Sequence, residues 1–132
     1  MSRNQIEELV KINTRQSEIR KEAEDVKNGN LSKEIKEAKL ADLKQEFKTA
    51  EEKRTGINEG KITSVDLLPI TVQDRIKRHA LKELTQELNP DGNKNIEITN
   101  EQIVKRANEL YKKQQDEIKI KIKKKSLNIL KM

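Results

Sequence analysis

The fold follows from residues 2–54, SRNQIEELVKINTRQSEIRKEAEDVKNGNLSKEIKEAKLADLKQEFKTAEEKR. Apolar residues recur there every three or four positions in two runs, which is the spacing of one face of an α-helix. Asn28, Gly29 and Asn30 separate the two runs. Glycine is common just past the end of a helix, so Gly29 is a natural C′ residue. Two amphipathic helices joined by a short turn predict an antiparallel αα-hairpin over residues 1–54.

Capping residues predict where these two helices begin. Ser2 and Gln5 have the spacing of a capping box, which predicts a first helix from Arg3 to Lys27. Ser32 can cap a second helix that ends at about Arg54. The face of the first helix has heptad-like spacing with one polar member, which is typical of coiled coils. The two faces comprise Leu9, Ile12, Gln16, Ile19, Ala23 and Val26, and then Ile35, Leu40, Leu43, Phe47 and Ala50.

A second helical region follows a break in the pattern. Residues 55–70 contain Gly56, Gly60 and Pro69 without a helical period, which predicts a linker or an ordered loop. Residues 71–117 then predict a helix-loop-helix, in which Asn89-Pro90-Asp91-Gly92-Asn93 ends the first helix. Capping-box pairs open its two helices, and these pairs are Thr71 with Asp74 and Thr99 with Gln102. The apolar faces are Val72, Ile76, Ala80, Leu84 and Leu88, and then Ile103, Val104, Ala107, Leu110, Tyr111, Gln114, Ile118 and Ile122.

The last segment, residues 118–132, reads IKIKIKKKSLNILKM. Isoleucine alternates with lysine over its first half, and this period of two favours a strand. Ile118 and Ile122 also continue the face of the preceding helix, so we expect helix to about Lys121 and then a frayed or strand-like end. The predicted fold is all-α and extended, with a basic apolar tail at residues 118–132.

The net charge of +6 resides entirely in this tail. Residues 1–54 carry 13 basic and 12 acidic side chains, and residues 55–117 carry 10 and 11. The tail carries six lysines and no acid. A neutral helical body with a cationic tail indicates contact with nucleic acid, an anionic membrane or an acidic protein surface.

The composition allows only a thin core. Apolar residues make up 32% of the chain and aromatic residues 2%, while charged residues make up 39%. A short chain buries a modest share of its surface, so we expect helices that are marginal alone and firm in an assembly. The absence of cysteine excludes disulfides and thiolate zinc sites. No stretch reaches the roughly 18–20 apolar residues of a membrane span, and we expect a cytoplasmic or virion location.

One loop invites comparison with a calcium site. Residues 91–102, DGNKNIEITNEQ, resemble an EF-hand loop at Asp91, Asn93 and Asn95. They depart from it where the turn glycine is replaced by Ile96 and the bidentate glutamate by Gln102. The sequence therefore favours an Asx/Gly turn, and a calcium-responsive module is a competing hypothesis.

No catalytic constellation is present. His79 is the only histidine, and its neighbours Arg75, Lys82 and Glu83 include no nucleophile. The sequence contains no glycine-rich phosphate loop and no HExxH or GxSxG motif. We expect no catalytic residue, no metal ligand, no cofactor and no enzymatic activity.

Basic residues support an alternative function as a nucleic-acid-associated accessory protein. Phosphates would be contacted by Arg75, Arg78, Lys119, Lys121, Lys123, Lys124 and Lys125. The connection between the last two helices exceeds the three or four residues of a DNA-reading helix-turn-helix, and few aromatic side chains are available to stack on bases. Binding would therefore be non-specific. Membrane binding is disfavoured because the tail lacks aromatic anchors.

In style the chain resembles helical virion components of bacteriophages, such as scaffolding, head-tail or internal proteins. The resemblance rests on NTRQSEIRKEAEDVKNGNLSKEIKEAKLADLKQEF at residues 13–47 and on LPITVQDRIKRHALKELTQELNPDG at residues 68–92. It covers most of the chain and contains no diagnostic motif, so it assigns no residue a role. It implies a protein that works within an assembly.

The leading hypothesis is a non-enzymatic structural or assembly protein that acts through helix–helix contacts with a protein partner or a second copy. Two sets of residues would make these contacts. The seam set is Leu9, Ile12, Ile19 and Val26, and the tail set is Ile118, Ile120 and Ile122.

Overall fold

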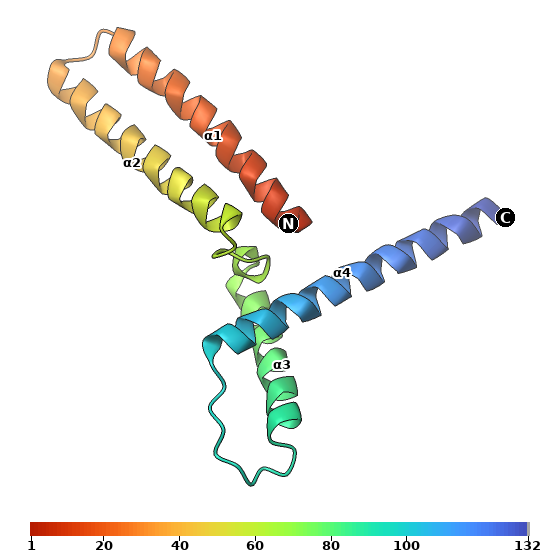
Figure 1. Cartoon of the computed structure of the whole chain (residues 1–132). Helices are drawn as coiled ribbons and strands as arrows, with labels where there is room; N and C mark the ends of the chain where they lie inside the picture. Colours follow the sequence, from red (N-terminus) through yellow and green to blue (C-terminus); the bar gives the residue numbers. More distant parts are fainter. Residues whose placement is uncertain (132) are drawn as a thin grey trace. The chain divides into compact units, whose positions relative to one another are not determined.

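The computed structural model describes residues 1–131, and their side chains as far as Lys125. Its elements are α1 (Arg3–Asn28), α2 (Lys33–Asn58), the 3₁₀ helix η1 (Val65–Leu67), α3 (Ile70–Leu88) and α4 (Asn100–Lys131) (Figure 1). None of the residues from 1 to 131 forms a strand, which confirms the predicted all-α fold. The chain divides into two compact units, Met1–Thr63 and Ser64–Met132.

The first unit is the predicted αα-hairpin. α1 and α2 lie side by side and are joined by a short turn (Figure 1). The capping box at the start of α1 is present, because the Ser2 backbone N–H donates to Gln5 Oε1 at 2.9 Å and the Gln5 N–H donates to Ser2 Oγ at 3.4 Å. Ser32 accepts in the same way from the N–H of Ile35 at the start of α2. The helix starts are thus confirmed.

The turn between α1 and α2 differs from its predicted geometry. Gly29 has φ −78° and ψ 173°, an extended conformation open to any residue. It does not adopt the left-handed conformation that usually places glycine after a helix. The Lys36 ammonium instead donates to the Lys27 carbonyl at 3.1 Å, satisfying one of the free carbonyls at the end of α1.

α2 continues past the predicted end at Arg54 to Asn58, and Gly56 lies inside it. The Gly56 carbonyl accepts from the backbone N–H groups of Lys61 (2.8 Å) and Ile62 (2.9 Å). A Cβ at position 56 would lie 2.7 Å from Ile62 Cδ1. The glycine therefore does not break the helix, because its missing side chain leaves room for Ile62 to fold back over the end of α2.

The second unit has a small core between α3 and α4. The buried residues are Val65, Ile76, Ala80 and Ala107, and the half-buried residues around them are Leu68, Val72, Ile103, Leu110 and Tyr111. The Val65 N–H donates to Asn108 Oδ1 of α4 at 3.1 Å. The segment predicted as a linker therefore supplies a fully buried side chain, Val65, and is fixed to the helix-loop-helix.

The start of α3 corrects one predicted cap. α3 begins at Ile70 after Pro69, so Thr71 lies inside the helix and forms no capping box with Asp74. Gln73 stabilises this end instead, because its side-chain Nε2 donates to the carbonyls of Asp66 (3.0 Å) and Leu68 (2.6 Å).

The start of α4 agrees with the prediction. The Thr99 N–H donates to Gln102 Oε1 at 2.9 Å, and the Gln102 N–H donates to Thr99 Oγ1 at 3.2 Å. The preceding loop is held by Asn89, whose amide Nδ2 donates to the Lys94 carbonyl at 2.6 Å and whose Oδ1 accepts from the Lys94 N–H at 3.1 Å. Gly92 has φ 69°, so the turn inside this clamp uses a left-handed residue.

The tail corrects a second prediction. Residues 118–131 are helical as part of α4, and the expected strand-like end is wrong. A helix satisfies its backbone hydrogen bonds within one segment, whereas a strand needs a neighbour to pair with. The Ile-Lys alternation therefore does not produce a strand here.

Candidate functional site

The seam residues lie at the interface between α1 and α2. Ile12 and Ile19 are 5% and 3% exposed, and Leu9 and Val26 are half-buried. This corrects the expectation that Ile12 and Ile19 bind another chain, because α2 of the same chain already covers them. The seam is the core of the hairpin.

The polar member of the seam is satisfied inside the hairpin. Gln16 is 3% exposed, and its Nε2 donates to Glu51 Oε2 at 3.0 Å and to the Phe47 carbonyl at 3.4 Å. Arg54 donates to Gln16 Oε1, to Asn13 Oδ1 and to Glu51, the last at 2.6 Å. Sequence periodicity identified Gln16 as a seam residue but gave no signal for Arg54, whose partners Asn13 and Gln16 lie on the other helix.

Ion pairs connect the helices along one flank of the hairpin. Arg15 donates to both carboxylate oxygens of Glu46, at 2.6 and 2.9 Å, and to Glu22 at 3.0 Å. Lys53 pairs with Glu8 at 2.7 Å. The hydrogen bond from Arg15 holds the pKa of Glu46 below its ordinary value, and the same bond raises the pKa of Arg15. These charges are matched within the chain.

The C-terminal part of α4 is left uncovered over ten consecutive residues. Every residue from Asp116 to Lys125 is exposed. Ile118, Ile120 and Ile122 are 47%, 55% and 60% exposed. Ile118 and Ile122 are one helical turn apart, on the face that Tyr111 and Ala107 begin, and Ile120 lies on the other side of the helix. Figure 1 shows this part of α4 extending past its crossing with α3.

Lysines surround these isoleucines. Lys119, Lys121, Lys123, Lys124 and Lys125 all lie on the exposed part of α4 and, among the side chains described up to residue 125, none forms an ion pair. Asp116 and Glu117 lie at the start of this part of α4, and residues 118–125 combine three isoleucines with five lysines and no acid. We call residues 116–125 the α4 extension.

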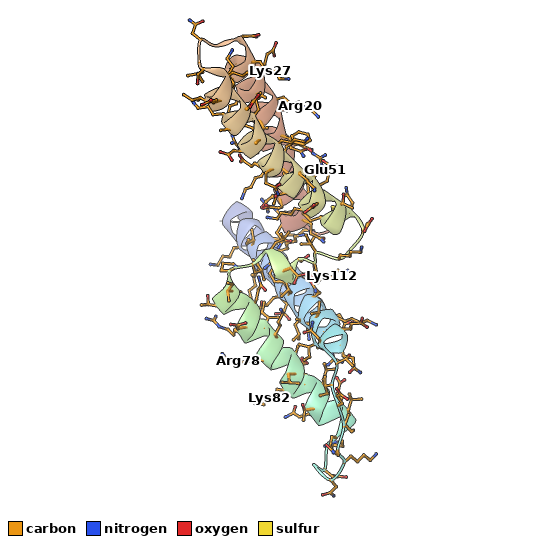
Figure 2. All side chains as sticks on the ribbon, turned by 90° about the vertical axis from the view of Figure 1, so that its left-hand side faces the viewer. Arg20, Lys27, Glu51, Arg78, Lys82 and Lys112 are labelled. Carbon is orange, nitrogen blue, oxygen red and sulfur yellow. The ribbon has the colours of Figure 1, made fainter. Side chains whose placement is uncertain are left out.

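A smaller basic cluster lies on α3. Arg75, Arg78 and Lys82 are exposed and spaced by three and four residues, so they share one face of the helix. Figure 2 shows Arg78 and Lys82 projecting from α3. Lys77 is half-buried and lies on a different side. These residues supply charge but no apolar surface.

The residues considered for chemistry do not assemble a reactive site. His79 is exposed, and its Nε2 lies 3.9 Å from Glu83 Oε2. In the calcium-like loop, Asp91, Asn93 and Asn95 all point to solvent as exposed residues around the Asn89 clamp. Among the described residues, no group of three His, Asp or Glu side chains is placed to hold a metal ion. Within residues 1–131, no helix combines the length and apolar character needed to cross a membrane.

A further contact that the sequence did not predict joins α3 to α4. Arg106 donates through two nitrogens to the two carboxylate oxygens of Glu87, at 2.8 and 2.7 Å. The hydrogen bonds lower the pKa of Glu87 and raise that of Arg106. This pair links α3 to α4 within the second unit.

Comparisons of the chain with protein-family models, with curated proteins and with solved structures found no match.

Proposed function

We propose that this chain is a non-enzymatic assembly protein, such as a helical component of a phage virion, that docks on a protein partner through the α4 extension. The observation that carries the proposal is the exposure of Ile118, Ile120 and Ile122 on a helix with no neighbour along residues 116–125. A lone helix of this length is marginal in water, and helices in proteins gain most of their stability from packing. The α4 extension therefore gains stability from a covering surface.

The chemistry of the extension specifies that surface. Isoleucines favour an apolar groove, and lysines on long aliphatic stems reach acidic groups at its rim. An acidic, partly apolar helix or groove satisfies both requirements, in the manner of helix-in-groove recognition. A second α4 extension meets them poorly, because its five lysines outnumber its two acidic residues, Asp116 and Glu117.

The competing function is non-specific phosphate binding, by the α4 extension together with Arg75 and Arg78. The two functions differ in what they require of the isoleucines. Phosphate contact depends on charge, so Ile120→Lys would leave the affinity for duplex DNA equal or higher. Protein docking depends on apolar contact, so the same substitution would weaken it.

The test compares two defined ligands with the full chain. One is a mixed-sequence DNA duplex, and the other is a synthetic helical peptide with leucines on one face and glutamates flanking them. We expect the peptide to bind, Ile120→Lys to weaken it several-fold, and DNA to bind weakly at physiological salt. Two results together would favour the nucleic-acid function. The peptide would not bind, and DNA would bind tightly with a steep salt dependence. Replacing Lys123, Lys124 and Lys125 with alanine would then reduce the slope of that salt dependence by about three units.

A further inference from the structure

The hairpin carries an open apolar groove of about 320 Å³ along one flank, in the half nearer its turn. The groove is lined by Ile19, Arg20, Ala23, Lys27, Leu40, Leu43, Lys44 and Phe47. The five apolar residues form the floor, and Ala23, Leu40, Leu43 and Phe47 are half-buried rather than covered. The hairpin core is therefore incomplete on this side.

The rim of the groove is basic. Its three charged residues are Arg20 and Lys27 on α1 and Lys44 on α2, and no acidic side chain of the described residues lines it. Figure 2 labels Lys27 near the turn and Arg20 farther along α1. The Arg20 guanidinium lies over the Phe47 ring, 5.3 Å from its centroid. None of the three cations forms an ion pair with another described side chain.

Other cations of the hairpin show the contrast. Arg15 and Lys53 are matched by Glu46, Glu22 and Glu8. These charges are therefore paired within the chain, whereas the groove presents three unpaired cations around an apolar floor. Complementary charge across an interface selects partners by sign.

We infer that this groove binds an amphipathic helix with acidic flanks, as a third helix that completes the hairpin core. The groove runs along α1 from Ile19 to Lys27, about 12 Å at the rise of an α-helix, which matches two turns of a partner helix. The partner would place apolar residues at positions i, i+3 or i+4, and i+7 on the floor. Glutamates or aspartates beside them would reach Arg20, Lys27 and Lys44.

The charge of the groove excludes two occupants from the chain itself. The α4 extension of a second copy carries lysines and no acid between residues 118 and 125, so it would meet the rim with like charge. A symmetric pairing of two grooves would place the three cations against their own copies. Like charges placed opposite one another are unfavourable in such contacts.

The test is a titration of the full chain with a leucine-faced peptide flanked by glutamates, followed by methyl NMR of isoleucine. Ile19 reports on the groove, whereas Ile118, Ile120 and Ile122 report on the α4 extension. Two matched triple variants each change the charge by the same amount. One is Arg20→Glu with Lys27→Glu and Lys44→Glu, and the other is Lys123→Glu with Lys124→Glu and Lys125→Glu.

We expect the peptide to shift the Ile19 methyl signal. The groove variant should lower the affinity of the groove for this peptide at least about tenfold. The same variant should bind a lysine-flanked peptide better than the parent does. The tail variant should leave the Ile19 response unchanged. A peptide with serine in place of leucine should not bind the groove, because it lacks the apolar contact. The groove variant should keep the helical content of the parent, since its three cations form no ion pairs.

Any one of four outcomes would overturn the inference. An Ile19 methyl that the peptide leaves unmoved removes the groove as a helix site. Equal binding of glutamate- and lysine-flanked peptides removes the charge argument. An Ile19 shift caused by vesicles of anionic phospholipid, with none caused by the peptide, assigns the groove to lipid. Peptide shifts confined to Ile118, Ile120 and Ile122 would also reject the groove while supporting the proposed function, so the two claims fail separately.

Discussion

At the scale of single residues, the buried side chain of Gln16 favours one register between the two helices of the hairpin. Gln16 interrupts an otherwise apolar seam, and its amide is held by Glu51, Arg54 and the Phe47 carbonyl. A buried polar side chain of this kind favours the one register in which its partners are in reach. It stabilises the observed pairing of α1 and α2 over shifted ones.

Gln16→Ala should therefore destabilise the hairpin. The substitution removes the hydrogen bonds that the buried Gln16 amide makes with the charged groups of Arg54 and Glu51, and a hydrogen bond to a charged group contributes about 1.5–3 kcal/mol. Urea denaturation followed by circular dichroism measures the change in the free energy of unfolding. Ser17→Ala, at the exposed neighbouring position, is the control, with an expected change within about 0.5 kcal/mol. Equal effects of the two substitutions would contradict the role given to Gln16.

Two carboxylates predict the acid sensitivity of the fold. Hydrogen bonds from Arg15 and Arg106 lower the folded-state pKa of Glu46 and Glu87 below the ordinary value of 4.5. The unfolded chain therefore binds these protons more readily, and the stability that the pairs contribute is present above pH 4.5 and lost as pH falls through the lowered pKa values. Melting temperatures measured from about pH 6 to about pH 3 should fall less steeply in Glu46→Gln with Glu87→Gln than in the parent. Parallel curves would show that the pairs contribute nothing.

At the scale of the element, apolar spacing determines which helical face is buried. The periodicity of α1 places Ile12 and Ile19 on one apolar face, and both are buried, whereas Ile6 and Val10 lie off that face and are 51% and 58% exposed. Local capping signals at Ser2, Ser32 and Thr99 were also sufficient to place helix starts. These features depend on neighbours in sequence, so the sequence alone predicts them.

Other features depend on contacts between distant residues and were missed. The sequence predicted that the second helix ends before Gly56. Gly56 instead lies within α2, and Ile62 packs in the space that a side chain at position 56 would fill. The capping box predicted at Thr71 does not form. Gln73 instead donates hydrogen bonds to the carbonyls of Asp66 and Leu68 at the start of α3. The groove also escaped prediction, because its floor and rim come from two helices whose register the sequence does not specify.

Truncation in the seam should distinguish core from surface. Ile19→Ala removes buried methyl groups and should lower the free energy of unfolding by about 2–5 kcal/mol. Val10→Ala, on the exposed face of the same helix, should change it by less than about 0.5 kcal/mol. Thermal and urea unfolding of both variants provide the measurement. A similar cost at the two positions would mean that the hairpin is not packed as described.

The two halves of α4 should differ in local stability. The first half packs on α3 through Ala107 and Leu110, whereas residues 116–125 have no covering neighbour. Amide hydrogens of residues 116–125 should therefore exchange faster than those of residues 103–111, because they open without breaking apolar contacts. Hydrogen exchange followed by NMR tests this directly. Uniform protection along α4 in the free protein would contradict the description of the extension as a lone helix.

At the scale of the whole molecule, the described structure holds matched charges inside each unit and has two surfaces that combine unpaired cations with apolar side chains. Arg15 pairs with Glu46 in the first unit, and Arg106 pairs with Glu87 in the second. The α4 extension and the groove rim keep their lysines and Arg20 free of ion pairs among the described side chains. Both surfaces combine these cations with apolar side chains, and a partner with acidic and apolar groups fits each of them.

The most direct test of the central claim is an isoleucine-methyl NMR titration of the full chain with the glutamate-flanked peptide and, separately, with duplex DNA. We expect the peptide to shift the methyl signals of Ile118, Ile120 and Ile122, Ile120→Lys to weaken peptide binding, and DNA to bind weakly at physiological salt. Two results together would contradict protein docking by the α4 extension. The peptide would leave the methyl signals of Ile118, Ile120 and Ile122 unmoved, and DNA binding would be strongly salt-dependent and as tight or tighter in Ile120→Lys.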